Sequence, residues 1–241
     1  MKSSDLKPIS SLAQNYGMKA VLYSGPGMGK TPMLTALPQP VALIAEPGTL
    51  SVRDAVKYGH VPAWEGFTGD RIREFFEWWF KSAEARQFNS LGIDSGSQIA
   101  EIILGYELKR NKDGRRAYGE MSRQVMEWFD QLFFQPQKNV FIICKEMSVE
   151  VGKNVTKQDG VLMIEPTFQA RPYFPGKELN VLVPHRYDSI LHVEDAHIPG
   201  VGKTRAIRTA GTDEVMARDR SGKLAELEPP DLAALIRKAM A

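Results

Sequence analysis

The chain has 241 residues, of which 43% are hydrophobic and 25% charged, a composition that is typical of a folded globular protein and excludes general disorder. Its formal net charge of +2 is too small to indicate nucleic-acid binding by itself, so any basic surface must be local. No apolar run approaches the roughly 18 residues of a membrane span, and residues 1–10 lack the apolar core of a signal peptide, so we expect a cytoplasmic protein with no membrane partner.

The first chemical motif is the glycine-rich segment "SGPGMGKT" at residues 24–31. It follows an apolar run at 18–23 that predicts a strand, and it precedes "PMLTAL", which predicts a short helix. This is the context of a phosphate-binding loop, in which Lys30 reaches the β- and γ-phosphates and the Thr31 hydroxyl binds Mg²⁺. The motif normally opens with glycine, but Ser24 is small enough to be tolerated there. The predicted ATP-binding residues are Ser24, Gly25, Pro26, Gly27, Met28, Gly29, Lys30 and Thr31.

Strands and helices alternate after this loop. Apolar runs predict strands at residues 40–48, 89–94 and 139–147, the last of which buries the lone cysteine. Helical spacing of apolar residues predicts amphipathic helices at 71–88 and 119–134, and a further helix closes the chain. This alternation is typical of a mostly parallel sheet with helices on its faces. The expected core-facing residues of the two amphipathic helices are Ile72, Phe75, Phe76, Trp79, Phe80, Ala83, Met121, Val125, Trp128, Phe129 and Leu132.

Two carboxylates stand where predicted strands end. Asp94 ends the strand "LGID", after which a helix is predicted, and Glu46 ends the strand "VALIAE". Ligands of an open parallel sheet bind beyond the carboxyl ends of its strands, so we expect both side chains beside the phosphate loop. Asp94 would hold Mg²⁺ through water, and Glu46 would orient or deprotonate the attacking water. The alternative for each is a surface acid at a strand end.

The loop pattern recurs as "PGVGKT" at residues 199–204, in a different context. Both flanks have the pattern of extended segments, and no apolar helical pattern follows Lys203. We interpret this copy as a β-hairpin turn that exposes a lysine, so the chain is expected to hold one nucleotide site.

Two later segments have the composition of a surface for single-stranded nucleic acid. Residues 108–119 hold five basic residues against one aspartate, and such a cluster can neutralise phosphates, with a solvated loop as the alternative. Residues 148–177 are predicted as a long irregular stretch whose aromatic and basic side chains suit base stacking, although acidic residues nearly cancel its charge. The candidate DNA-binding residues are Lys109, Arg110, Lys112, Arg115, Arg116, Lys153, Lys157, Phe168 and Arg171, with Tyr173 and Phe174 as further aromatic candidates.

The segment "MARDRSGKL" at residues 216–224 carries a pair of arginines. Ser221 and Gly222 can form a tight turn, which predicts a β-hairpin. Arg218 and Arg220 are two residues apart and would share one face of its strand. A solvated charged hairpin is the alternative to a function for this pair.

Taken together, these segments resemble a known family. "YSGPGMGKT", "LIAEPG", "LGIDSGS", "RRAYGEMSRQVMEWFDQL", "NVFIICK" and "MARDRSGKL" occur in the order found in phage nucleotide-binding ATPases of the RecA-like kind, and they most resemble the Sak-type single-strand annealing proteins that are reduced to a RecA core. The resemblance covers roughly residues 18–237. It implies a RecA-type P-loop α/β fold, with a mostly parallel central sheet flanked by helices and with C-terminal β-hairpins. We therefore expect one domain over residues 1–241, with a lead-in at 1–17 and a β-rich part and closing helix at 178–241.

The resemblance also implies a function. The activity would be ATP binding and hydrolysis, with ATP and Mg²⁺, coupled to single-stranded DNA binding in recombination or strand annealing. The implied partners are copies of the same chain in an oligomer or filament and a single-strand-binding protein, in the host cytoplasm if a phage encodes the chain. The alternatives are a loader or motor that acts on a replication or packaging protein, and a module in which ATP serves only assembly.

Roles for residues near the loop follow from the same resemblance. Lys30 and Thr31 match the phosphate and Mg²⁺ residues of the family, and Asp94 matches its acidic residue on the Mg²⁺ side. Glu46 falls where RecA-like proteins keep the glutamate that activates water. Lys145 stands at a strand end where relatives often carry a His or Gln sensor, so it would contact the γ-phosphate, and a plain surface lysine is the alternative.

Residues farther along the chain match features that act between subunits or on DNA. Arg218 and Arg220 correspond to a basic pair that reaches across the subunit interface to the neighbour's γ-phosphate. Residues 108–119 and 148–177 correspond to the first and second DNA loops. The expected catalytic set is Lys30, Glu46, Asp94, Arg218 and Arg220.

Overall fold

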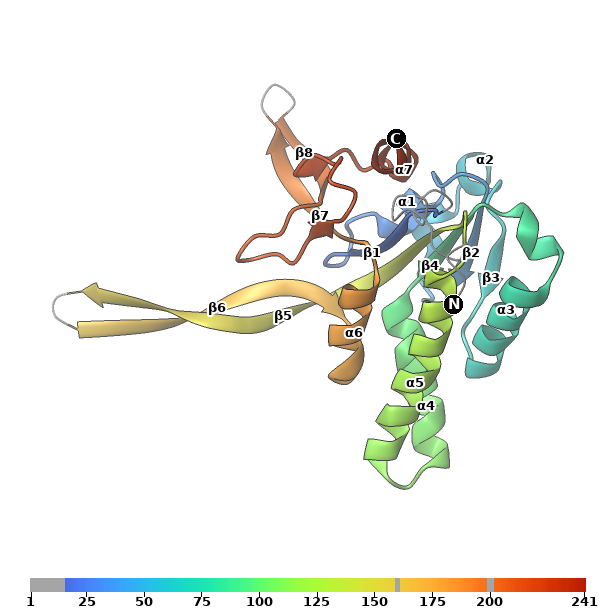
Figure 1. Cartoon of the computed structure of the whole chain (residues 1–241), viewed down its shortest axis with the longest axis horizontal. Coiled ribbons are helices and arrows are strands. Elements are labelled where there is room, and N and C mark those ends of the chain that lie inside the picture. Colours follow the sequence, from blue (N-terminus) through green and yellow to red (C-terminus); the bar gives the residue numbers. More distant parts are fainter. Residues whose placement is uncertain (1–15, 159–160, 199–201) are drawn as a thin grey trace, which may run out of the picture.

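The computed structural model describes residues 16–158, 161–198 and 202–241, and its centre is a twisted β-sheet (Figure 1). The parallel strands are β1 (Lys19–Tyr23), β2 (Pro40–Ile44), β3 (Ala63–Glu65), β4 (Ser90–Asp94), β5 (Asn139–Gln158) and β7 (Ser189–Ile198). The strand order is β10-β8-β7-β1-β5-β4-β2-β3, so β1 lies between β5 and β7. Because neighbouring strands are distant in sequence, the chain crosses the sheet repeatedly, and parallel strands require such crossovers. The predicted α/β core, with a mostly parallel central sheet flanked by helices, is confirmed.

Antiparallel strands extend this sheet. They are β6 (Val161–Tyr173), β8 (Gly202–Arg208), β9 (Arg218–Asp219) and β10 (Leu227–Glu228). The expected C-terminal hairpin is present, because β7 and β8 pair from His192 to Ile198. Its turn at residues 199–201 lies outside the described residues.

Helices cover both faces of the sheet. They are α1 (Lys30–Leu34), α2 (Ala55–Tyr58), α3 (Gly69–Lys81), α4 (Gly96–Arg110), α5 (Gly114–Phe133), α6 (Glu178–Arg186) and α7 (Leu232–Met240), with short 3₁₀ turns at Thr49–Val52 and Glu84–Gln87. Side chains alternate along β1, so Val21 and Tyr23 join the core under α3, α4, α5 and α6, whereas Ala20 and Leu22 join the core under α1 and α7. All five residues of β1 are buried, as expected for a strand that is covered on both faces.

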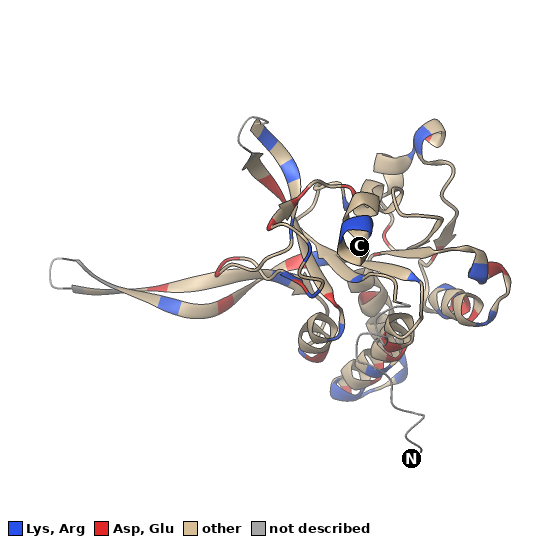
Figure 2. Ribbon diagram, turned by 45° about the horizontal axis from the view of Figure 1, so that its top comes forward, with Lys and Arg blue, Asp and Glu red and all other residues tan. Residues whose placement is uncertain are grey.

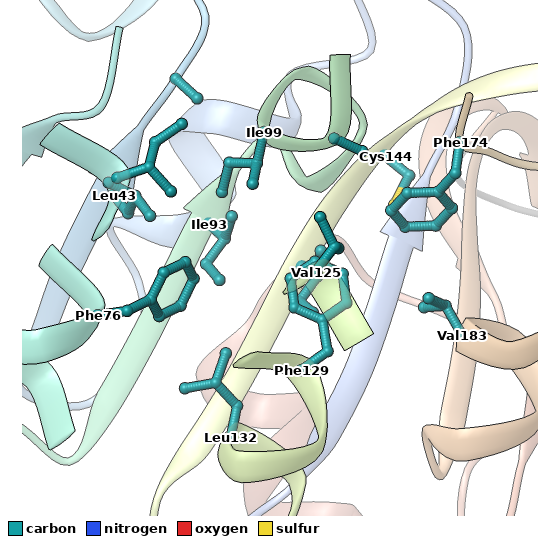
Figure 3. Packing of buried hydrophobic residues seen from close by; sticks show 14 of the residues in the cluster. Leu43, Phe76, Ile93, Ile99, Val125, Phe129, Leu132, Cys144, Phe174 and Val183 are labelled. Atoms are coloured by element: carbon teal, nitrogen blue, oxygen red, sulfur yellow. The ribbon is translucent and has the colours of Figure 1, made fainter. Parts of the chain in front are cut away.

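The larger core explains the helix patterns (Figure 3). Phe129 of α5 and Phe174 meet edge to face, with ring centroids 6.1 Å apart, beside the buried Cys144. Phe174 is therefore a core residue, and its suggested use in base stacking was wrong. The core-facing residues that the sequence predicted and the structure buries are Ile72, Phe75, Phe76, Trp79, Met121, Val125, Phe129 and Leu132, with Phe80 and Trp128 at the margin.

Helix α3 ends at Lys81 rather than continuing to residue 88, because Ser82 adopts an extended conformation. Ala83 is consequently exposed instead of core-facing. Helix α6 was missed in the part at 178–241, which was expected to be β-rich before its closing helix; Pro184 inside α6 disguises the helical pattern.

The prediction that residues 148–177 are irregular was wrong, because most of them form two paired strands. Strand β5 continues far beyond the sheet and pairs with β6 from Lys145–Tyr173 out to Gln158–Val161, forming a two-stranded arm that projects from the body (Figure 1). Burial alternates along β5 only near the base of the arm, where Met147 and Val149 are half-buried and Ser148 is exposed, whereas all the side chains at 150–155 are exposed. The arm exposes apolar side chains, namely Val151, Val155, Leu162, Ile164 and Phe168.

The basic segment at residues 108–119 is not a loop either. Helix α4 continues to Arg110, and α5 begins at Gly114 after the Asp113 side chain accepts a hydrogen bond from the backbone of Arg115 at 2.9 Å. The cluster thus occupies the turn between two adjacent antiparallel helices, and Figure 2 shows blue segments at this end of the pair. In the described part of the chain no helix is long and apolar enough to cross a membrane.

Candidate nucleotide site

The phosphate loop joins the end of β1 to the start of α1. Gly27 and Gly29 both have φ of +76°, a region that side chains other than glycine rarely adopt. Successive backbone turns of this kind before a helix present N–H groups that can bind an anion. The geometry of residues 24–31 therefore has the form that the glycine spacing predicted.

Lys30 lies folded against its own loop. Its ammonium donates to the carbonyl oxygens of Ser24 and Gly25, both at 2.9 Å, and to the Ser24 hydroxyl at 3.0 Å. Burial lowers the pKa of Lys30, while the carboxylates of Asp94 and Glu46 oppose that shift. Ser24 thus serves as a further ligand of the lysine at the position where the motif usually has glycine.

Asp94 and Thr31 form the oxygen pair expected for Mg²⁺. The Thr31 hydroxyl donates to Oδ2 of Asp94 at 2.5 Å, and Asp94 is only 6% exposed. Burial raises the pKa of Asp94, the Thr31 hydrogen bond lowers it, Glu46 raises it further and Lys30 lowers it; the net shift is upward. Neighbouring hydroxyl and carboxylate oxygens suit a hard cation that retains waters, so these residues fit Mg²⁺.

Glu46 lies beside Asp94 because β2 and β4 are neighbours. Ile44 pairs with Asp94, and the backbone N–H groups of Ala45 and Glu46 both donate to the Asp94 carbonyl, at 2.6 and 3.3 Å. The Ser95 hydroxyl donates to Oε1 of Glu46 at 2.5 Å and also caps α4. This holds the carboxylate at the cavity of about 460 Å³ that Lys30 and the loop also line.

Lys145 also lines this cavity, but its ammonium binds helix α4. It donates to Glu101 at 2.7 Å and to Gln98 at 2.9 Å, so its contact with a γ-phosphate stays a prediction. The next residue, Glu146, lines the cavity as well and contacts Nε2 of His192 at 2.8 Å. Glu146 was not selected from the sequence, because no local pattern marks this residue within β5 as part of a site.

The second glycine-rich copy lies in the β7–β8 hairpin. Lys203 is 75% exposed and pairs with Asp195 at 3.1 Å, as a hairpin lysine should. Arg205, two residues further, donates from Nη2 to the Gly27 carbonyl at 3.0 Å. The hairpin that contains the second glycine-rich copy therefore places Arg205 against the phosphate loop at residues 24–31. No local sequence pattern predicts this contact, because it depends on the pairing of distant strands.

Arg218 and Arg220 lie at the other edge of the sheet. Strand β9 pairs with the start of β7 through Ile190, so the predicted hairpin around Ser221 and Gly222 was wrong; the Asp219 carboxylate instead accepts from Ser221. Arg218 donates to the carbonyls of Pro184 and Tyr187, each at 2.5 Å, and Arg220 donates to Asp188 at 3.2 Å and to the carbonyl of His185. Within one chain the pair does not reach the loop, and a role in a neighbour's site stays a prediction.

The candidate DNA residues fall into two separate groups. The five cations at the α4–α5 turn are all exposed, and Arg110 donates to the Tyr106 hydroxyl at 2.6 Å. On the arm, Lys153 is exposed and Phe168 is 51% exposed, whereas Arg171 is partly buried and donates to Gln169. The side chain of Lys157 lies outside the described residues.

The chain is similar to known proteins in sequence and in fold. The sequence matches a family model described as an AAA domain over residues 16–221. Among solved structures, a KaiC-like protein from the hyperthermophilic archaeon Pyrococcus horikoshii is similar over 80% of this chain and 78% of its own, with 12% identity and a TM-score of 0.41. No curated protein matches the sequence.

Proposed function

The chain belongs to the AAA domain family, and we propose that it hydrolyses ATP while it binds single-stranded DNA, in recombination or strand annealing. The observation that carries the ATPase activity is the meeting of Lys30, Asp94 and Glu46 at one edge of the sheet, beside a loop of phosphate-binding geometry. Three distant parts of the sequence are brought together there, as a P-loop ATPase requires.

The residues have separate tasks in this proposal. Lys30 binds the β- and γ-phosphates, and the loop backbone binds the phosphate oxygens through N–H groups. Glu46, held by Ser95, orients the attacking water or takes its proton. Thr31 and Asp94 hold Mg²⁺, which supplies charge neutralisation at the phosphates.

Single-stranded DNA binding rests on the cluster at the α4–α5 turn. Five exposed cations lie within eight residues at the end of the α4–α5 pair, which projects from the body (Figure 1), and they suit contact with a phosphate backbone. The arm supports the same function more weakly, since Phe168 is free to stack and Lys153 is exposed. We propose that the active form is a homo-oligomer or filament, in which the arginine pair at the opposite edge of the sheet meets a neighbour's site.

The DNA proposal is tested by single-strand binding at several salt concentrations. Neutralising the turn cluster should weaken binding and flatten its log–log salt dependence by roughly 0.7 per lost phosphate contact. A matched control removes five exposed cations elsewhere, so that both variants have the same net charge. The test set is Lys109, Arg110, Lys112, Arg115 and Arg116, and the control set is Lys57, Lys81, Arg123, Lys223 and Arg237. An unchanged slope in the test variant, or an equal loss in the control, contradicts the proposal.

One observation supports the alternative function, a loader or motor that acts on a protein partner, namely the apolar surface of the arm. Val155, Leu162 and Ile164 are each more than 60% exposed, and such surface is typical of protein contacts. ATP turnover measured with single-stranded DNA, double-stranded DNA and RNA separates the two functions. Turnover and binding that are indifferent to every nucleic acid would favour the protein partner.

A further inference from the structure

Arg205 of β8 lies against the phosphate loop of its own chain. Its Nη2 donates to the Gly27 carbonyl at 3.0 Å, across 178 residues of sequence. Its Nη1 is so close to Gly29 that an added Cβ there would be 2.6 Å away. One guanidinium is thus hydrogen-bonded to Gly27 and lies close to Gly29 in the same loop.

The strand pairing explains why this hairpin reaches the loop. Strand β7 runs beside β1 until Tyr23 pairs with His192, and there β1 ends and the loop begins. Strand β7 continues with β8 on its other edge, and Asp195 pairs with Arg205 three residues further on. Arg205 is therefore carried past the carboxyl edge of the sheet, to the level of the loop.

The base of the hairpin is braced, which fixes the strand that carries Arg205. Arg208, on the same strand, binds both oxygens of Glu194 at 2.9 and 2.8 Å and binds Glu226 at 2.6 Å. The pKa of Arg208 is raised by these carboxylates, chiefly by the hydrogen bonds to Glu194. His192 lies between Glu146 and Glu194, so the brace continues to a residue that lines the nucleotide cavity.

The charge of Arg205 is available to a ligand. In the described ranges no carboxylate pairs with it, although Lys203 and Arg208 of the same strand are both paired. Only one of its N–H groups is bonded to the Gly27 carbonyl, so others of the planar fork can meet a further oxygen. A guanidinium fork is suited to phosphate oxygens, and this one stands beside a phosphate-binding loop.

We propose that Arg205 is a positioning residue of its own chain's nucleotide site, which holds the phosphate loop by Gly27 and adds its positive charge to nucleotide binding. This rests on the proposed nucleotide function of the loop. It differs from the role expected of Arg218 and Arg220, because Arg205 serves the site within one chain. The same contact links nucleotide occupancy to the β7–β8 hairpin.

The test measures equilibrium binding of a fluorescent ATP analogue to the wild type, Arg205→Ala, Arg205→Lys and Lys203→Ala. Loss of a hydrogen bond to a charged group at an exposed position should weaken binding about tenfold in Arg205→Ala. Arg205→Lys keeps the charge without the fork and should recover part of the affinity. Lys203→Ala also removes one positive charge, but from a position two residues nearer the turn of the hairpin. This variant should bind the analogue within about twofold of the wild type.

Steady-state kinetics add a readout that a purely structural role would not move. Arg205→Ala should raise KM while kcat changes little, because the lost interaction is made before the chemical step. The inference is wrong if Arg205→Ala binds like the wild type, if Lys203→Ala loses as much, or if Arg205→Lys recovers nothing while its melting temperature is normal. Failure of the wild type itself to bind nucleotide would instead refute the proposed function.

Discussion

Replacing Asp94 by Asn should make the nucleotide-free protein more stable at neutral pH while it abolishes Mg²⁺-dependent ATP hydrolysis. Asp94 is 6% exposed, and its burial raises its pKa despite the hydrogen bond from Thr31. The ionised carboxylate therefore destabilises the fold at neutral pH, and in the proposed mechanism its charge is needed to hold Mg²⁺. Asn retains an oxygen that can accept the Thr31 hydroxyl, but it carries no charge.

The expected gain is about 1 kcal/mol, the usual size for a single stabilising change, which corresponds to about 2–4 °C in melting temperature for a chain of this length. The pH dependence has a definite sign. The pKa of Asp94 in the folded protein lies above its unfolded value of about 3.9, so the ionised side chain lowers the free energy of unfolding by its full amount above the folded pKa, and this loss disappears as pH falls toward the unfolded pKa. The advantage of Asp94→Asn should shrink in the same direction.

The assay is thermal unfolding of the wild type, Asp94→Asn and Asp213→Asn, without nucleotide, from pH 8 down to pH 4.5. Asp213 is exposed, so its variant controls for the loss of one negative charge. The reasoning is refuted if Asp94→Asn melts at or below the wild-type temperature at pH 7.5. A gain that stays constant down to pH 4.5, or that Asp213→Asn reproduces, refutes it equally.

Three further predictions concern turnover. Lys30→Ala should abolish ATP binding or hydrolysis while Lys203→Ala leaves hydrolysis nearly intact, and equal losses measured in folded proteins would contradict the hairpin interpretation of the second motif. Glu46→Gln should keep ATP affinity but lower kcat by on the order of 10²–10⁴-fold, the usual loss for a general base; turnover near that of the wild type would remove Glu46 from the mechanism. Arg218→Ala/Arg220→Ala should bind ATP normally yet hydrolyse it poorly in the assembly, and mixing it with Lys30→Ala should restore activity at hybrid interfaces. If the two variants co-assemble and hydrolysis is not restored, Arg218 and Arg220 do not act in a neighbour's site.

The sequence determined the features that depend on short stretches of chain. Glycine is strongly favoured at the positive φ that Gly27 and Gly29 adopt, so the phosphate loop was recognisable from its glycine spacing. The spacing of apolar residues predicted the buried faces of α3 and α5, because burial of one face of a helix imposes that spacing. Apolar runs also predicted strands that end near Asp94 and Glu46, and a general rule about parallel sheets placed both carboxylates at the site; strand β2 ends at Ile44, two residues before Glu46.

Periodicity failed where elements leave the core. The outer part of the arm formed by β5 and β6 and the last residues of α4 lie outside both cores and are mostly exposed, and neither was recognised as regular structure from the sequence. Their hydrogen-bonded backbone, rather than burial, holds these segments in regular structure. The cations of the α4–α5 turn were identified correctly as a cluster, but their helical setting was not.

Only the tertiary structure decided which distant residues meet at the loop. Arg205 contacts Gly27 across 178 residues because β7 lies beside β1 and extends past its end, and Glu146 joins the same cavity because β5 lies on the other side of β1. At the opposite edge of the sheet, β9 pairs with the start of β7, and Arg218 therefore donates hydrogen bonds to two carbonyls at the end of α6. Strand order is a property of the whole fold, since it is set by the joint packing of both cores, and no local stretch of this sequence encodes it.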